Sequence, residues 1–108
     1  MTSVALTDEA LSDLERLEEF LARAGDPLAD RLLDFVLDAV QVLTHQPGIG
    51  RPAGRVPGIP GARGYRELII SRRRSGYLAK YHYDEVSDSV YVLRLRHQRE
   101  SGYSAEEI

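Results

Sequence analysis

Residues 77–97 read YLAKYHYDEVSDSVYVLRLRH, and this stretch decides which fold the sequence predicts. Residues 77–83 and 89–97 are rich in β-branched and aromatic side chains, which favour strands. The polar run 84–88 between them is short enough for a hairpin turn. We therefore predict two antiparallel strands whose successive side chains point to opposite faces of a sheet.

Alternation along this hairpin predicts what each face of the sheet carries. In residues 89–97, one face should carry Tyr91, Leu93 and Leu95, and the other should carry Val92, Arg94 and Arg96. In residues 77–83, one face should carry Tyr77, Ala79, Tyr81 and Tyr83, and the other should carry Leu78, Lys80 and His82. We expect helices to cover the face with Leu93 and Leu95, which leaves an open, shallow surface lined by Arg94, Arg96 and either the tyrosine set or the Lys80 and His82 set. Such a surface suits an acidic peptide, a phosphate backbone or stacked bases, although an ordinary solvated sheet face has the same composition.

The segments before the hairpin complete the predicted fold. Residues 65–71 continue the alternation and predict another strand, and residues 3–6 suggest a short edge strand. Leucines at helical spacing after a Thr7 N-cap predict a first helix, whose acidic residues, Asp13 among them, lie largely off the apolar stripe. Gly25-Asp26-Pro27 ends that helix and starts a second, about residues 27–44, which we expect to be buried on two sides.

Residues 45–64 have no periodic pattern and contain six glycines and four prolines, so we predict an irregular loop. A loop of this length inside a compact domain is often functional. The predicted class is α+β, with the order β-α-α-β-β-β and a helical hairpin packed on one face of a small antiparallel sheet. Residues 1–108 should form a single domain, with a flexible tail at 104–108.

Composition narrows the function. The chain has 108 residues and no cysteine, which excludes disulfides, thiol nucleophiles and thiolate metal sites. It shows no membrane-spanning run and no leader peptide, so we expect a cytoplasmic protein that has no membrane partner. The net charge of −3 conceals an acidic part, residues 1–45 at −7, and a basic part, residues 46–74 at +6. The basic part is either a local anion-binding surface or a solvated loop.

Candidate chemistry centres on the end of the last strand. His97 follows Arg96, and a flanking guanidinium favours the neutral imidazole, which suits a general base or a hydrogen-bond donor. A histidine that caps the end of a strand is the simpler alternative. The three histidines lack metal-ligand spacing, and no phosphate-binding loop or nucleophile elbow occurs. We therefore expect neither a metal nor a cofactor.

The ordered set of motifs resembles the RelE/ParE superfamily of type II toxins over about residues 3–103. The residues that carry the resemblance are Gly64-Tyr65-Arg66-Glu67-Leu68, Tyr81-His82-Tyr83-Asp84 and the run from Val90 to Glu100. The ending is most similar to the ParE, or plasmid-stabilisation, branch. The resemblance implies a cytoplasmic toxin that a cognate antitoxin neutralises by winding an acidic or amphipathic C-terminal segment around it.

In the ParE branch the resemblance implies inhibition of DNA gyrase by binding, without bond chemistry. For that function, we predict a contact cluster for the target and antitoxin made of Arg63, Arg66, Arg94, Arg96, His97 and Arg99. Homodimers and hetero-oligomers with the antitoxin both stay open. A sheet edge that is exposed without the antitoxin would favour the homodimer.

Two alternatives follow from the same resemblance. A RelE-like toxin would cut mRNA on the ribosome, with Arg66, Arg96, His97 and Tyr103 in catalytic roles. The single lysine, Lys80, and the acidic net charge disfavour binding to ribosomal RNA. The other alternative is a degenerate, non-toxic member that binds an antitoxin.

Overall fold

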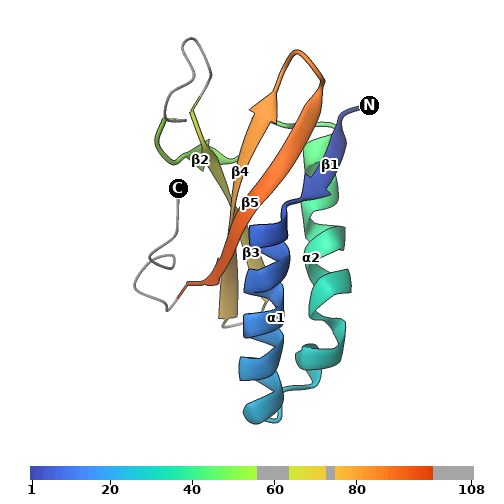
Figure 1. Ribbon diagram of the computed structural model, residues 1–108, viewed down its shortest axis with the longest axis vertical. Helices are drawn as coiled ribbons and strands as arrows, with labels where there is room; N and C mark the ends of the chain where they lie inside the picture. The colour runs from blue at the N-terminus through green and yellow to red at the C-terminus, as the bar shows by residue number, and fades with distance from the viewer. Residues whose placement is uncertain (56–63, 73–74, 99–108) are drawn as a thin grey trace.

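The computed structural model describes residues 1–55, 64–72 and 75–98, which form one helical layer and one sheet. Figure 1 shows the helices α1 (Asp8–Arg23) and α2 (Leu32–Val40) side by side against the sheet. The strands are β1 (Ser3–Leu6), β2 (Arg51–Pro52), β3 (Arg66–Arg72), β4 (Ser75–Asp84) and β5 (Ser89–His97). The predicted α+β class is therefore confirmed. The tail 104–108 lies outside the described residues.

Capping chemistry sets the helix boundaries where the sequence predicted them. The Thr7 hydroxyl accepts a hydrogen bond from the Ala10 N–H, and the Asp26 carboxylate accepts one from the Leu28 N–H. Gly25 lies at φ +70°, in the left-handed region that ends helices. The predicted helix over 27–44 is, however, divided. A 3₁₀ turn (Pro27–Arg31) precedes α2, and a second (Gln41–Thr44) follows it.

The sheet is mixed, whereas the sequence predicted an antiparallel one. Its strand order is β1-β5-β4-β3-β2, with β1 at one edge as expected. β1 runs parallel to β5 and pairs Ser3 with Ser89 and Leu6 with Val92. Every other neighbouring pair is antiparallel. The short strand β2, inside the segment predicted to be irregular, pairs with the start of β3.

A β-bulge corrects the predicted faces of β5. Lys80 pairs with Arg94 and Tyr81 with Val92, so Leu93 is an extra residue without a partner in β4. The bulge shifts the alternation. Val90 and Val92 face the helices before it, and Leu95 does so after it. Tyr91 is therefore exposed, where the sequence placed it in the core.

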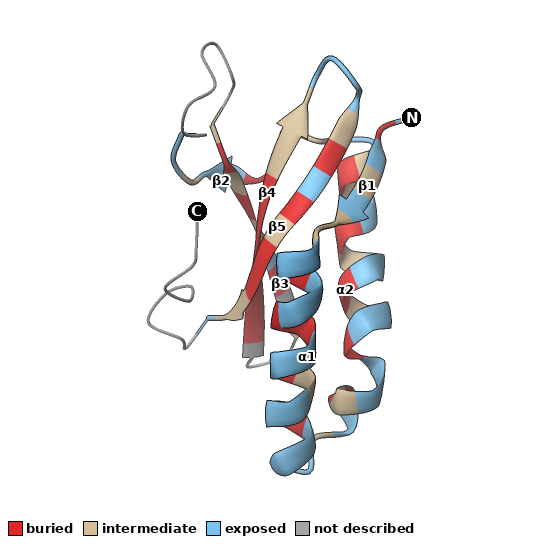
Figure 2. Cartoon of the chain, viewed as in Figure 1, coloured by how far each residue is buried: buried red, intermediate tan, exposed pale blue. Residues whose placement is uncertain are grey.

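The core lies between the helical layer and the sheet (Figure 2). α1 contributes a leucine stripe, and α2 contributes one row consisting of Leu32, Val36 and Val40. β4 adds Tyr77, Ala79 and Tyr81, so the tyrosine set of residues 77–83 is the one that meets the helices, a choice that the sequence left open. The expected two-sided burial of the second helix is wrong in part, because Leu33 and Leu37 are 43% and 36% exposed.

Candidate functional site

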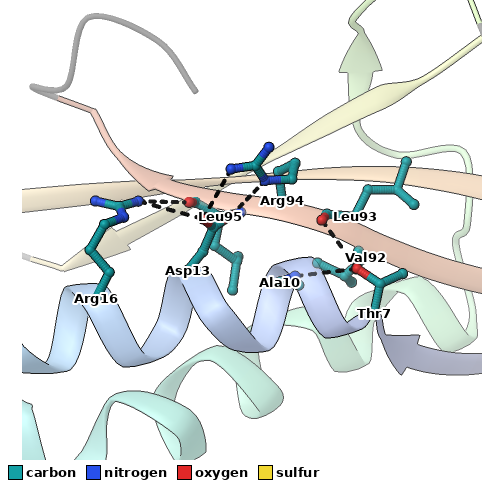
Figure 3. A network of polar contacts seen from close by, with 8 residues as sticks. All are labelled: Thr7, Ala10, Asp13, Arg16, Val92, Leu93, Arg94 and Leu95. Atoms are coloured by element: carbon teal, nitrogen blue, oxygen red, sulfur yellow. Dashed lines mark hydrogen bonds and ion pairs between the residues drawn. The ribbon is translucent and has the colours of Figure 1, made fainter. Parts of the chain in front are cut away.

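The end of β5, which carries the predicted site residues, is held by a single carboxylate of α1. Beyond Leu6, β1 no longer covers the edge of β5, and α1 continues beside it (Figures 1 and 3). The carboxylate of Asp13 accepts hydrogen bonds from the Leu95 N–H at 2.9 Å and from Arg94 Nε at 2.9 Å. Arg94 Nη2 donates to its other oxygen at 3.2 Å. This ion pair is buried, because Asp13 is 5% and Arg94 4% exposed.

Two further contacts extend this attachment on either side of Asp13. The Thr7 hydroxyl donates to the carbonyls of Val92 and Leu93, each at 3.1 Å, where the bulge leaves them at the strand edge. Arg16 Nη2 donates to the Leu95 carbonyl at 3.5 Å. Figure 3 shows the three side chains in line along α1, facing β5. The first three turns of α1 therefore fix where Arg96 and His97 emerge.

His97 lies at an open groove between the end of β5 and the C-terminal half of α1. Its ring meets the Tyr77 ring edge-on, with 5.2 Å between centroids. The groove has a volume of about 550 Å³ and is lined by Arg16, Leu17, Glu19, Phe20, Leu21, Arg23, Ala24, Asp26, Tyr77 and His97. Phe20, at the rim, is 66% exposed. We call this feature the His97 groove; it combines aromatic and aliphatic surface with side chains of both charges, the arginines Arg16 and Arg23 and the acids Glu19 and Asp26.

Arg96 points away from the His97 groove. It pairs with Leu78, whereas His97 pairs with Tyr77, and adjacent positions of a strand face opposite sides of the sheet. The two neighbours that the sequence grouped together therefore serve different surfaces. A ligand of one face cannot contact both side chains unless it wraps around the strand end.

The face of the sheet that points away from the helices carries buried side chains at its centre, although the sequence predicted an open surface there. Glu67, Lys80 and Arg94 form one row across three strands, and each is less than 9% exposed. The row continues to Arg51, whose Nη2 lies 2.6 Å from the Glu67 carboxylate. In the middle of the row, Lys80 Nζ lies 4.8 Å from the centroid of the Tyr65 ring. Arg94, predicted as a contact residue, is thus engaged by Asp13 within the fold.

Arg66 pairs with Tyr81, four residues along β4 from Tyr77, the partner of His97. Its Nη1 donates to the Gly50 carbonyl at 2.7 Å. The neighbouring Tyr81 hydroxyl accepts from the Gly50 N–H at 2.9 Å and donates to the Pro47 carbonyl at 2.8 Å. Burial raises the pKa of Tyr81, which keeps the phenol protonated as a donor. These contacts fasten the start of the glycine- and proline-rich loop to β3 and β4.

The residues predicted for RNA cleavage do not converge among the described residues. Arg66 pairs with Tyr81 and His97 aligns with Tyr77, so the two rows are roughly 13 Å apart along β4. Arg96 is on the other face. Acid–base catalysis needs groups within hydrogen-bond reach of one reacting centre. Tyr103, like the predicted contacts Arg63 and Arg99, lies outside the described residues.

Asp13, Tyr77 and Phe20 belong to this region, but the sequence analysis did not single them out. Asp13 was assigned to the solvent, although it lies three residues after Ala10 and four before Leu17, both buried. That spacing places it on the flank of the buried stripe. In residues 1–55, 64–72 and 75–98, no group of three His, Asp or Glu side chains could hold a metal ion. None of the described helices is long and apolar enough to cross a membrane.

Comparison with known proteins places this geometry in context. The family model described as "ParE toxin of type II toxin-antitoxin system, parDE" matches residues 4–102. No curated protein matches the chain. A structure titled "Chromosomal ParDE TA system from P. aeruginosa" is 22% identical, with a TM-score of 0.59, and the match covers 88% of this chain and 94% of that one. A structure of a metal-bound toxin from Helicobacter pylori is 17% identical, with a TM-score of 0.53 and coverage of 94% and 100%. Both share the fold.

Proposed function

The chain belongs to the ParE toxin family of type II toxin–antitoxin systems, and we propose that it arrests growth by binding DNA gyrase in the cytoplasm. A cognate antitoxin is the partner expected from this family. We propose that an acidic or amphipathic C-terminal segment of that antitoxin neutralises the toxin. The function is thus one of binding, and the chain itself makes or breaks no bond.

The separation of Arg66, Arg96 and His97 is the observation that supports binding over catalysis. Arg66 and His97 lie at rows four residues apart along β4, roughly 13 Å, and Arg96 is on the other face of the sheet. Contact with a large protein does not need such groups to converge, whereas RNA cleavage does. The His97 groove also has the exposed aromatic and arginine side chains that are enriched at protein interfaces.

The proposed contact surface wraps around the end of β5, so it includes Arg96 on one face of the sheet and His97 on the other, together with Phe20 on the groove rim. Both β5 residues are half-buried, so their substitution removes contact area without opening the core. Arg63, Arg66 and Arg99 stay predicted contacts. Arg94 is excluded from this surface because its guanidinium is buried against Asp13.

The test measures which synthesis stops first after induction in a bacterial host without the antitoxin. We expect DNA synthesis to stop before protein synthesis, and the purified chain to inhibit supercoiling by gyrase. Earlier arrest of protein synthesis would replace this proposal with ribosome-dependent RNA cleavage. Continued synthesis of both, with folded protein present, would indicate a non-toxic member.

A pair of double variants tests the contact surface. Arg96→Ala with His97→Ala should raise the concentration for half-inhibition of gyrase at least about tenfold. Its Tm should stay within a few degrees of wild type, because partly exposed charges add little stability. The matched control, Arg31→Ala with His45→Ala, removes the same side-chain types from exposed positions elsewhere and should inhibit like wild type. Full inhibition by folded Arg96→Ala, His97→Ala protein would refute the assignment.

A further inference from the structure

The side of α2 that faces away from the sheet carries apolar and acidic side chains in adjacent rows. The sequence Leu33-Asp34-Phe35-Val36-Leu37-Asp38 repeats a Leu-Asp pair after four residues, so the two pairs lie one helical turn apart. We call Leu33, Asp34, Leu37 and Asp38 the outer face of α2. All four are exposed, and Figure 2 shows this side of α2 in the exposed colour.

The two leucines of the outer face add nothing to the core. The buried row of α2 consists of Leu32, Val36 and Val40, and it supplies the contacts with α1 and the sheet. Leu33 and Leu37 remain 43% and 36% exposed in consecutive turns. Single exposed leucines are common on protein surfaces, but two aligned on one short helix form an apolar stripe.

The two aspartates of the outer face repel each other, and Asp38 disfavours the helix in this chain alone. Within the described residues neither forms a side-chain hydrogen bond or an ion pair. Asp34 lies in the first turn of α2, where negative charge favours the helix dipole, but Asp38 lies in the last turn, where negative charge opposes it. The like charges at i,i+4 add a repulsion of their own. A partner with positive charge would turn this repulsion into attraction.

An open groove adjoins the outer face. It has a volume of about 670 Å³ and is lined by Pro27, Leu28, Asp30, Arg31, Asp34, Phe35 and Asp38. The half-buried Phe35 and buried Leu28 supply an apolar base, and Asp30 continues the acidic edge beyond the start of α2. The surface is thus hollowed and apolar along one side, and its polar side holds three acids, Asp30, Asp34 and Asp38, against the single base Arg31.

We propose that the outer face of α2 docks a basic amphipathic helix of a partner protein. Such a helix has the same 1.5 Å rise per residue as α2, so residues four apart recur at about 6 Å on both. Its leucine-type side chains would cover Leu33 and Leu37, while adjacent lysines or arginines would meet Asp34 and Asp38. Charge complementarity commits the site to a basic segment, since residues 1–45 carry a net charge of −7. The proposal does not depend on gyrase as the target.

Binding to a defined probe tests this proposal. The probe is a labelled synthetic helix of about 16 residues, with Leu-Lys pairs at every fourth residue and alanine between them. Fluorescence anisotropy with the full chain should show saturable binding that weakens as salt rises. A peptide of equal composition, with its leucines spread around the helix, should bind at least about tenfold more weakly.

Protein variants locate the binding. Leu33→Ala with Leu37→Ala, and separately Asp34→Asn with Asp38→Asn, should each weaken binding at least about tenfold. The matched control, Glu15→Gln with Glu19→Gln, removes two exposed acids at the same spacing from α1 and should change Kd by less than about twofold. Circular dichroism verifies the fold of each variant. Absence of saturable binding, equal binding of the two peptides, or an equal loss in the α1 control would overturn the proposal.

Discussion

Asp13→Ala should lower the free energy of unfolding far more than loss of an exposed acid on α1, because it removes the buried carboxylate that accepts three hydrogen bonds from Arg94 and Leu95. Asp13 is 5% and Arg94 4% exposed, and three hydrogen bonds of 2.9–3.2 Å end on the carboxylate. Removing one partner of a buried ion pair costs about 3–5 kcal/mol. Part of that loss comes from the Leu95 N–H, which the substitution leaves without the Asp13 acceptor, since an unsatisfied buried donor costs about 1–3 kcal/mol. We therefore expect a total of about 3–5 kcal/mol.

Urea unfolding, followed by circular dichroism, measures this loss as a shift of the midpoint at constant m-value. A double-mutant cycle with Asp13→Leu and Arg94→Met isolates the pair. The double variant should cost much less than the sum, because apolar replacements of similar volume leave no buried charge. Glu19→Ala is the control. It breaks an exposed ion pair with Arg23 and should cost about 0–1 kcal/mol. A loss below about 1 kcal/mol for Asp13→Ala, or additive single effects, would refute the reasoning.

Three further predictions concern other contacts. Tyr81→Phe should cost about 1–3 kcal/mol in urea unfolding, because the buried Gly50 N–H loses its acceptor; a neutral result would show that this N–H is otherwise satisfied. Hydrogen bonds from the Thr2 and Tyr83 hydroxyls lower the pKa of Asp88 below its ordinary value of 3.8. The stability that the Asp88 carboxylate adds to the fold is therefore present above pH 3.8 and is lost as the pH falls through the lowered pKa of the folded state. Asp88→Asn should therefore unfold with a shallower pH dependence below about pH 4 in acid titrations, and an unchanged profile would contradict this sign. Gly25→Ala should cost about 1–2 kcal/mol of stability, because Gly25 lies at φ +70°, which a residue with a Cβ rarely adopts. Gly48→Ala should be neutral or stabilising, although an added Cβ meets no atom within 4 Å at either position. Similar Tm shifts for the two variants would show that the backbone angle of Gly25 does not matter.

Local chemistry allowed the sequence to predict the helices and most strands. Thr7, Gly25 and Asp26 act through the backbone groups of their own neighbours, so their roles can be read from a few residues. The strands β4 and β5 were predicted because alternation needs no information from the rest of the chain. The class of fold follows from the order of these elements.

The features that the sequence missed depend on distant partners or on a change of register. Val92 and Leu95 are both core residues three positions apart, and alternation cannot reveal that an extra residue, Leu93, separates them. The parallel pairing of β1 depends on a strand 86 residues later. Asp13 was placed in solvent because its partners, Arg94 and Leu95, lie more than 80 residues away.

The candidate site was predicted in part for the same reason. The sequence correctly pointed to the end of β5, where Arg96 and His97 lie. It grouped them as one cluster because they are neighbours in the chain, whereas the pleat sends them to opposite faces. Phe20 and Tyr77 lie 57 residues apart in the sequence, and only the packing of α1 against the sheet brings them to the same groove.

The parallel pairing of β1 with β5 also determines when the first elements can join the sheet during synthesis. β1 and α1 leave the ribosome before β5, the strand that accepts them. Until Ser89–His97 is available, Asp13 has no arginine to hold and β1 has no neighbour. Such long-range pairing folds late and slowly. The attachment of β1 and α1 to the sheet, and with it the position of Arg96 and His97, is therefore established only after residues 89–97 have been synthesised.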